Sequence, residues 1–295
     1  MTPVACSGRL PSAIYMLGTR ILTALVMIPL VLAALFLLPP LGWGTVALAA
    51  IAIAAVEWAR LAGSSQRRQA LFAACIVGIG AAAMLVPAAG FGAGGWPARV
   101  LVALCAPALV FWLLVAPRWL QSNFRPDSEA AMALTGAIVL IGAWAAVVSL
   151  QARGPWLVLA AMAIVWIADT AAYFAGRAFG RRKLAPAISP GKTWEGVYGA
   201  LAAVAAYAFA LVPFAPRAGY ASEISPLATI AWIVVALGLV MLSIAGDLFE
   251  SLLKRHAGVK DSGKVLPGHG GVLDRIDALL AAMPAAALLA QGLLK

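Results

Sequence analysis

Residues 227–247 read LATIAWIVVALGLVMLSIAGD and carry no charge before the last residue, Asp247. A helix needs about 20 mostly apolar residues to cross the bilayer core, so this run predicts a transmembrane helix. Eight other apolar runs complete a set at 21–38, 43–62, 70–88, 97–116, 130–150, 156–175, 196–214, 227–247 and 274–294. The sequence therefore predicts an all-α polytopic membrane protein with about nine transmembrane helices. Residues 1–20 form a short N-terminal segment, and residues 21–295 form a single integral membrane domain.

The composition supports a chain whose surroundings are mostly lipid. It is 64% hydrophobic and only 11% charged, whereas a soluble domain carries about 25% charged residues. The net charge of +10 could suggest nucleic acid, but the Lys and Arg residues sit in short segments between apolar runs. No basic stripe with interleaved aromatic residues is present, so nucleic acid is not an expected partner. Membrane lipids are expected partners.

The basic residues also predict the orientation. The N-terminus and the even-numbered loops together hold seventeen of the 21 Lys and Arg residues, and the other side holds four. Basic loops stay in the cytoplasm. We therefore expect a cytoplasmic N-terminus, a C-terminus outside, and two polar cytoplasmic loops at 176–195 and 248–273.

The segment from Asp247 to Asp277 reads DLFESLLKRHAGVKDSGKVLPGHGGVLDRID and is the most polar part of the chain. On a helix, Asp247, Ser251 and Lys254 share one face, and Asp274 and Asp277 lie one turn apart. Carboxylates at a membrane helix end suit a hard cation such as magnesium, and nearby cations suit phosphate oxygens. The simpler alternative for each charge is that it flanks a membrane helix and interacts with the helix dipole.

This segment resembles a family signature. Ser251-Leu-Leu-Lys-Arg, then Lys260-Asp261, then His269-Gly-Gly-Val-Leu-Asp274-Arg275-Ile-Asp277 is similar to the signature of phosphatidate cytidylyltransferases, also called CDP-diacylglycerol synthases. The resemblance implies that CTP and phosphatidate react to give CDP-diacylglycerol and pyrophosphate. It also implies magnesium, with a second cation such as potassium. The expected location is a bacterial cytoplasmic (inner) membrane, with the active site facing the cytoplasm.

A second motif agrees with the first. Ser189-Pro-Gly-Lys192-Thr193-Trp-Glu195-Gly196 resembles the other loop motif of the family, although many members appear with Lys where this chain has Gly191. A P-loop is excluded because Pro186 stands where its first Gly is required. Asp169 lies inside the sixth run, and an intramembrane Asp indicates function by default. The alternative is that Asp169 pairs with a neighbouring helix for packing.

These motifs give the predicted site. The predicted catalytic residues are Asp247, Lys254, Arg255, Lys260, Asp261 and Asp274. The predicted substrate-binding residues are Asp169, Ser189, Lys192, Thr193, Glu195, Ser251, Lys264, His269, Gly270, Gly271 and Arg275. The predicted magnesium ligands are Asp247, Asp274 and Asp277. Glu57 is interpreted as a partner of Arg60 at helical spacing and is kept outside the site.

Three other functions are alternatives to the cytidylyltransferase hypothesis. A CTP-dependent polyprenol or phytol kinase would yield CDP in place of pyrophosphate, and the complete C-terminal signature argues against it. A CDP-alcohol phosphotransferase needs an acidic motif of different spacing. A transporter for an anionic solute would place its charges at mid-membrane and not at one face. The sequence does not set the oligomeric state and leaves a homodimer open.

Overall fold

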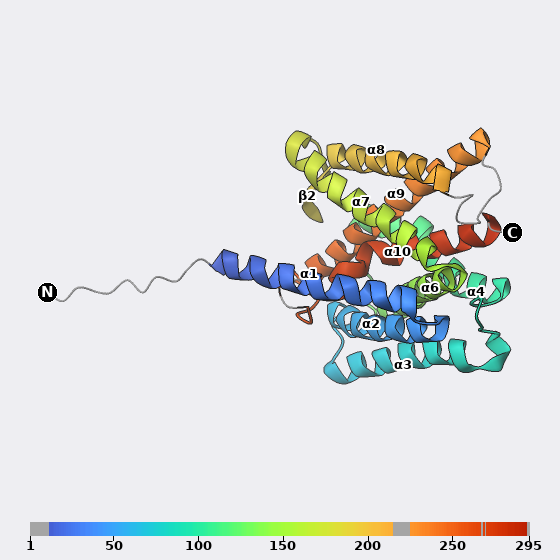
Figure 1. Cartoon of the computed structure of the whole chain (residues 1–295). Helices are drawn as coiled ribbons and strands as arrows, with labels where there is room; N and C mark the ends of the chain where they lie inside the picture. Colours follow the sequence, from blue (N-terminus) through green and yellow to red (C-terminus); the bar gives the residue numbers. More distant parts are fainter. Residues whose placement is uncertain (1–11, 215–224, 267, 269, 294–295) are drawn as a thin grey trace, which may run out of the picture.

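Long helices run side by side through the computed structural model, which describes residues 12–214, 225–266, 268 and 270–293 (Figure 1). The α-helices are α1 (Ser12–Leu37), α2 (Pro40–Leu61), α3 (Gln66–Leu85), α4 (Ala98–Val110), α5 (Ala116–Ser122), α6 (Glu129–Arg153), α7 (Pro155–Phe179), α8 (Trp194–Leu211), α9 (Pro226–His256) and α10 (Leu273–Leu293). Short turns η1 (Pro87–Ala89), η2 (Phe111–Val115) and η3 (Val212–Phe214) extend or join them.

Each of the nine predicted runs lies within or overlaps one of these helical stretches. Within the described residues, seven helices are long and apolar enough to cross a membrane: Pro40–Leu61, Gln66–Leu85, Ala98–Ser122, Glu129–Arg153, Pro155–Phe179, Trp194–Phe214 and Pro226–His256. The predicted class, an all-α polytopic membrane protein, is therefore confirmed. The count of nine and the sides of the two termini stay predictions.

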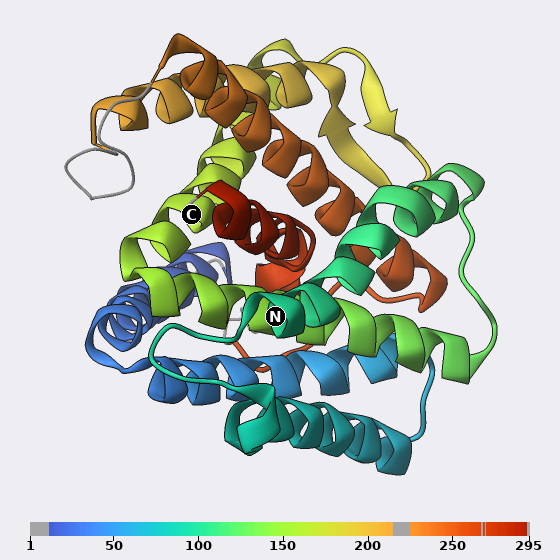
Figure 2. The ribbon, with the colours of Figure 1, turned by 90° about the vertical axis from the view of Figure 1, so that its right-hand side faces the viewer.

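Helix α10 occupies the middle of the bundle. Figure 2 shows it surrounded by α4, α6, α7 and α9. Its central residues Ala281, Ala282 and Met283 are fully buried, and Trp112 of η2 donates a hydrogen bond to its Leu280 carbonyl at 3.0 Å. Small residues let neighbouring backbones approach closely in a membrane, where packing takes over from the hydrophobic effect. The position of α10 matters because its first turn carries Asp274 and Asp277.

Helix α9 is longer than the sequence predicts. The predicted span ends at Asp247, but α9 continues to His256, so a third of the predicted loop 248–273 is helical. The residues from Leu248 to His256 contain neither Gly nor Pro, and the helix ends just before Gly258, whose φ is +68°. The polar residues of this stretch are therefore held on a rigid helix.

The other predicted loop, residues 176–195, contains a small β-hairpin. Strand β1 (Lys183–Ala185) pairs antiparallel with β2 (Ser189–Thr193), with Lys183 opposite Thr193 and Ala185 opposite Ser189. The sequence did not predict these strands. They lie at the same end of the bundle as the C-terminal end of α9 (Figure 1).

Candidate active site

The two polar segments meet at one end of the bundle. The Lys192 Nζ atom of β2 lies 2.6 Å from the Asp247 Oδ2 atom of α9. Just over two turns further along α9, the Arg255 Nε atom donates to the carbonyl of Ile188 at 3.2 Å. Ile188 also packs against Leu248 and Leu252 of α9. One ion pair, one hydrogen bond and one apolar contact therefore fix the hairpin against α9.

The motif residues beside Lys192 form hydrogen bonds that hold the hairpin in place. Thr193 is the N-cap of α8, and its hydroxyl accepts a hydrogen bond from the Gly196 N–H at 3.2 Å. Glu195 accepts from the backbone N–H groups of Arg181 and Arg182, at 3.0 and 3.2 Å. A capping hydroxyl and a first-turn carboxylate both stabilise a helix start. Thr193 and Glu195 thus hold the hairpin that presents Lys192, while Ser189 lies at the start of β2.

Three carboxylates from different helices surround the Lys192 contact. Asp247 of α9 is close enough to Asp169 of α7 and to Asp277 of α10 to repel both electrostatically. Lys192 is the cation that also acts on Asp169. The Ser251 hydroxyl donates to Asp247 at 3.4 Å. Carboxylates from three helices therefore form one acidic group, with Lys192 against Asp247 and Lys254 acting on Asp277.

A second network lies next to this acidic group. The Lys254 Nζ atom contacts Glu250 Oε2 at 2.6 Å and Asp274 Oδ1 at 2.8 Å. Asp274 also accepts from the N–H groups of Ser262, at 3.0 Å, and Gly271, at 2.7 Å. Both carboxylate side chains are only 4% exposed. A buried carboxylate requires this degree of pairing, so Lys254 and Asp274 are committed to contacts within the protein.

The loop between α9 and α10 wraps around Asp274. Gly270 has a φ of +85°, and a Cβ atom there would lie 2.7 Å from the Asp274 Oδ2 atom. The remaining predicted charges are exposed, namely Arg255, Lys260, Asp261, Lys264 and Arg275. His269 lies outside the described residues.

Two carboxylates at this end were missed by the sequence reasoning. Glu250 lies one turn after Asp247 in a run that reads as polar loop. Glu57 was assigned to Arg60, but the structure shows its carboxylate accepting from Ser262, Val272 and Leu273. The available signal was an acidic residue in an otherwise apolar stretch, which is costly unless it has partners.

Comparison with known proteins agrees with this geometry. The sequence matches the cytidylyltransferase family over residues 18–293. The chain belongs to this family. It is 41% identical over 285 residues to a phosphatidate cytidylyltransferase from Pseudomonas aeruginosa, covering 93% of this chain and 97% of the relative. It is 37% identical over 283 residues to one from Haemophilus influenzae, covering 91% and 96%. A relative of the same name from Brucella suis is 50% identical over 121 residues, 41% of each chain.

The carboxylates of this cytidylyltransferase suit a divalent cation only in part. Within the described residues, no three acidic, His or Cys side chains are grouped closely enough to hold a metal ion alone. Magnesium is usually bound by one or two carboxylates, with water and substrate phosphates completing its shell. Asp247, which is 34% exposed, and its neighbour Asp277 match that pattern. Asp274 matches it less well, because three protein donors, on Lys254, Ser262 and Gly271, already engage its oxygens.

The arrangement suits chemistry between two phosphates. A lysine against a carboxylate, together with exposed cations in the loop between α9 and α10, would suit the binding of phosphate groups. Phosphoryl and nucleotidyl transfers depend mainly on positioning and charge stabilisation. No protein nucleophile is required, since one substrate supplies the attacking oxygen.

Proposed function

We propose that this cytidylyltransferase transfers the cytidylyl group of CTP to phosphatidate, giving CDP-diacylglycerol and pyrophosphate. The observation that carries the proposal is the contact between Lys192 and Asp247, which brings the motif 189–196 against the polar segment that begins at Asp247. The names of the relatives that cover nearly the whole chain supply the substrates.

The proposed reaction has one step. A phosphate oxygen of phosphatidate attacks the α-phosphorus of CTP, the bond to the β-phosphate bridging oxygen breaks, and pyrophosphate leaves. Lys192 and the exposed Lys260, Lys264 and Arg275 hold the phosphates that Asp247 would otherwise repel. Arg255 keeps the hairpin docked through Ile188.

Magnesium is the proposed cofactor. Asp247 and Asp277 would hold it, with Asp169 close by, and Asp274 keeps the structural contacts described above. When bound, the ion neutralises phosphate charge and stabilises the leaving pyrophosphate. A second cation such as potassium remains an expectation from the family resemblance.

We also propose nine transmembrane helices, a cytoplasmic N-terminus, and an active site facing the cytoplasm of a bacterial inner membrane. The distribution of basic residues supports this orientation. The start of α1 and the end of α10 lie at opposite ends of the bundle (Figure 1), as an odd number of spans requires.

Phosphorus labelling tests which group moves. The purified protein in detergent micelles receives phosphatidate, magnesium and CTP labelled at either the α- or the γ-phosphate. The proposal predicts that α-label enters the lipid and γ-label leaves as pyrophosphate. A parallel reaction contains a lipid alcohol in place of phosphatidate. Transfer of γ-label to that alcohol, with CDP as the other product and no α-label in phosphatidate-derived lipid, would replace the proposal with a kinase.

A further inference from the structure

Glu57 is a buried carboxylate far from the family motifs in sequence. It lies in α2 and is 2% exposed. It accepts hydrogen bonds from the Ser262 hydroxyl at 3.1 Å, the Val272 N–H at 3.2 Å and the Leu273 N–H at 2.7 Å. All three donors are neutral and lie more than 200 residues later. Burying a carboxylate is costly unless such bonds satisfy it, so this contact is a specific feature of the fold.

The donors belong to the start of α10. The first N–H groups of a helix have no partner within it, and the positive end of the helix dipole favours an anion. Leu273 is the first residue of α10 and Val272 precedes it. Glu57 therefore caps α10 from another helix, in the place that a side chain of the same loop often takes.

Two glycines make room for this carboxylate. A Cβ atom on Gly271 would lie 2.5 Å from the Glu57 Oε2 atom, and one on Gly263 would overlap the Oε1 atom. Both glycines belong to the loop that resembles the family signature. The loop is therefore shaped around Glu57 as well as around Asp274.

Ser262 connects Glu57 with the site. Its hydroxyl donates to Glu57, and its backbone N–H donates to Asp274. Asp274 in turn holds Lys254 of α9. The start of α10 is thus fixed from α2 on one side and from α9 on the other, and Asp277 follows one turn later.

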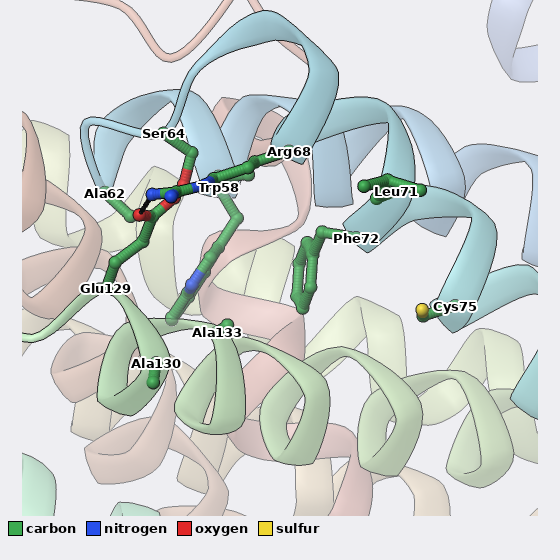
Figure 3. Close-up of a pocket in the computed structure, with 11 residues that line it drawn as sticks. Trp58, Ala62, Ser64, Arg68, Leu71, Phe72, Cys75, Glu129, Ala130 and Ala133 are labelled. Carbon is green, nitrogen blue, oxygen red and sulfur yellow. Dashed lines mark hydrogen bonds and ion pairs between the residues drawn. The ribbon is translucent and has the colours of Figure 1, made fainter.

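Helix α2 is itself rigidly held at this point. Trp58, the next residue, donates to the Met132 carbonyl of α6 at 2.9 Å. Its ring stacks on Phe249 of α9, with centroids 6.1 Å apart. Figure 3 shows Trp58 in the wall of an apolar pocket of about 360 Å³, beside the ion pair of Arg68 and Glu129. The carboxylate of Glu57 therefore has a fixed position from which to orient α10.

We propose that Glu57 is a positioning residue for cytidylyl transfer, which holds the start of α10 so that Asp277 faces Asp247. This role rests on the proposed function. It predicts that losing the carboxylate slows turnover and weakens the response to magnesium, with less effect on CTP binding by the exposed cations.

Three variants of the full-length protein test the role. Glu57→Gln keeps the size but turns one accepting oxygen into an N–H donor that faces other donors. Ser262→Ala removes one of the three hydrogen bonds. Glu129→Gln is the matched control, because it makes the same carboxyl-to-amide change in the exposed pair with Arg68. For each, kcat, KM for CTP, the half-saturating magnesium concentration and the thermal unfolding midpoint are measured in micelles.

The expected result for Glu57→Gln is a fall in kcat per folded molecule of about tenfold or more, with a higher magnesium requirement and a nearly unchanged KM for CTP. Its unfolding midpoint should fall, because the new N–H donor faces other donors at a buried position. The kcat of Ser262→Ala should fall less than that of Glu57→Gln, and the kcat of Glu129→Gln should not fall. A protein that combines Glu57→Gln with Ser262→Ala should have the same kcat as Glu57→Gln alone, because both changes remove the same contact. A Glu57→Gln protein with wild-type kcat per folded molecule would overturn the role, as would an equal fall in Glu129→Gln. If Glu57→Gln does not fold, an unchanged kcat in Ser262→Ala overturns it instead. Wild-type protein that releases no pyrophosphate would overturn the proposed function itself.

Discussion

Lys192 has the clearest single-residue role, because among the described residues it is the cation that forms an ion pair with Asp247. Its neighbours explain how it is held there. Thr193 caps α8, and Glu195 binds the backbone before β1. From the sequence alone, Lys192 could equally be a phosphate-binding cation or a charge that only sets the membrane topology. The contact with Asp247 favours a role in phosphate binding. The sequence does not predict this contact, because the positions of two loops along the chain do not determine the distance between them in the fold.

Replacing Lys192 with Met should reduce kcat/KM for CTP by about 10- to 100-fold, since a hydrogen bond to a charged group contributes about 1.5–3 kcal/mol. Steady-state pyrophosphate release measures the change. Lys183→Met is the control, because Lys183 is exposed in the same hairpin and forms no ion pair within the described residues. Equal losses in the two variants would point to a general effect of hairpin charge.

Asp247→Asn should raise the magnesium concentration needed for half-maximal rate by about tenfold, because a neutral amide binds a hard cation less strongly than a carboxylate. Titration of magnesium at saturating CTP gives this value. Asp127→Asn, at an exposed acid before α6, should leave it unchanged. An unaltered magnesium requirement in Asp247→Asn would remove Asp247 from the proposed ligands.

Among the helices, the contact between α9 and α10 does most to set the site. Gly246 lies where a Cβ atom would be 2.5 Å from the Asp277 carbonyl oxygen and 3.1 Å from the Ala278 Cα atom. The apolar runs of both helices could be predicted from hydropathy alone. The distance between α9 and α10 could not be predicted in this way. Nor could the helical extension beyond Asp247, which aligns Glu250 and Lys254 with Asp274.

Gly246→Ala should therefore separate α9 from α10 and lower the thermal unfolding midpoint, at a cost of about 1–3 kcal/mol for overpacking. Gly238→Ala is a control in the same helix, because a Cβ atom there meets nothing within 4 Å. It lies about two and a half turns before Asp247, on the opposite face of α9. We expect Gly238→Ala to unfold at or above the wild-type midpoint with full activity. A fall of equal size in both variants would contradict the close contact at Gly246.

At the scale of the whole molecule, the polar hairpin, the end of α9 and the start of α10 all lie at one end of the bundle (Figure 1). Hydropathy and basic residues predicted the spans and grouped both polar loops on one side. They did not reveal Glu57, because its partners follow it by more than 200 positions. No periodicity connects residues so far apart, and only the packing of α2 against α10 brings them together.

Cysteine labelling tests the orientation. In a chain whose native cysteines are replaced, Gly92→Cys and Ala187→Cys place thiols at two exposed turns, the second in the hairpin. A membrane-impermeant maleimide added to spheroplasts should label Gly92→Cys only, and both after lysis. Labelling of Ala187→Cys in intact spheroplasts would place the site outside the cytoplasm.

The most direct test of the account is pyrophosphate release by the purified protein with CTP, phosphatidate and magnesium, beside the double variant Lys192→Met/Asp247→Asn. The account predicts release that requires all three components and falls to background in the variant. Release that persists in a folded double variant would contradict the claim that the two polar segments form one active site.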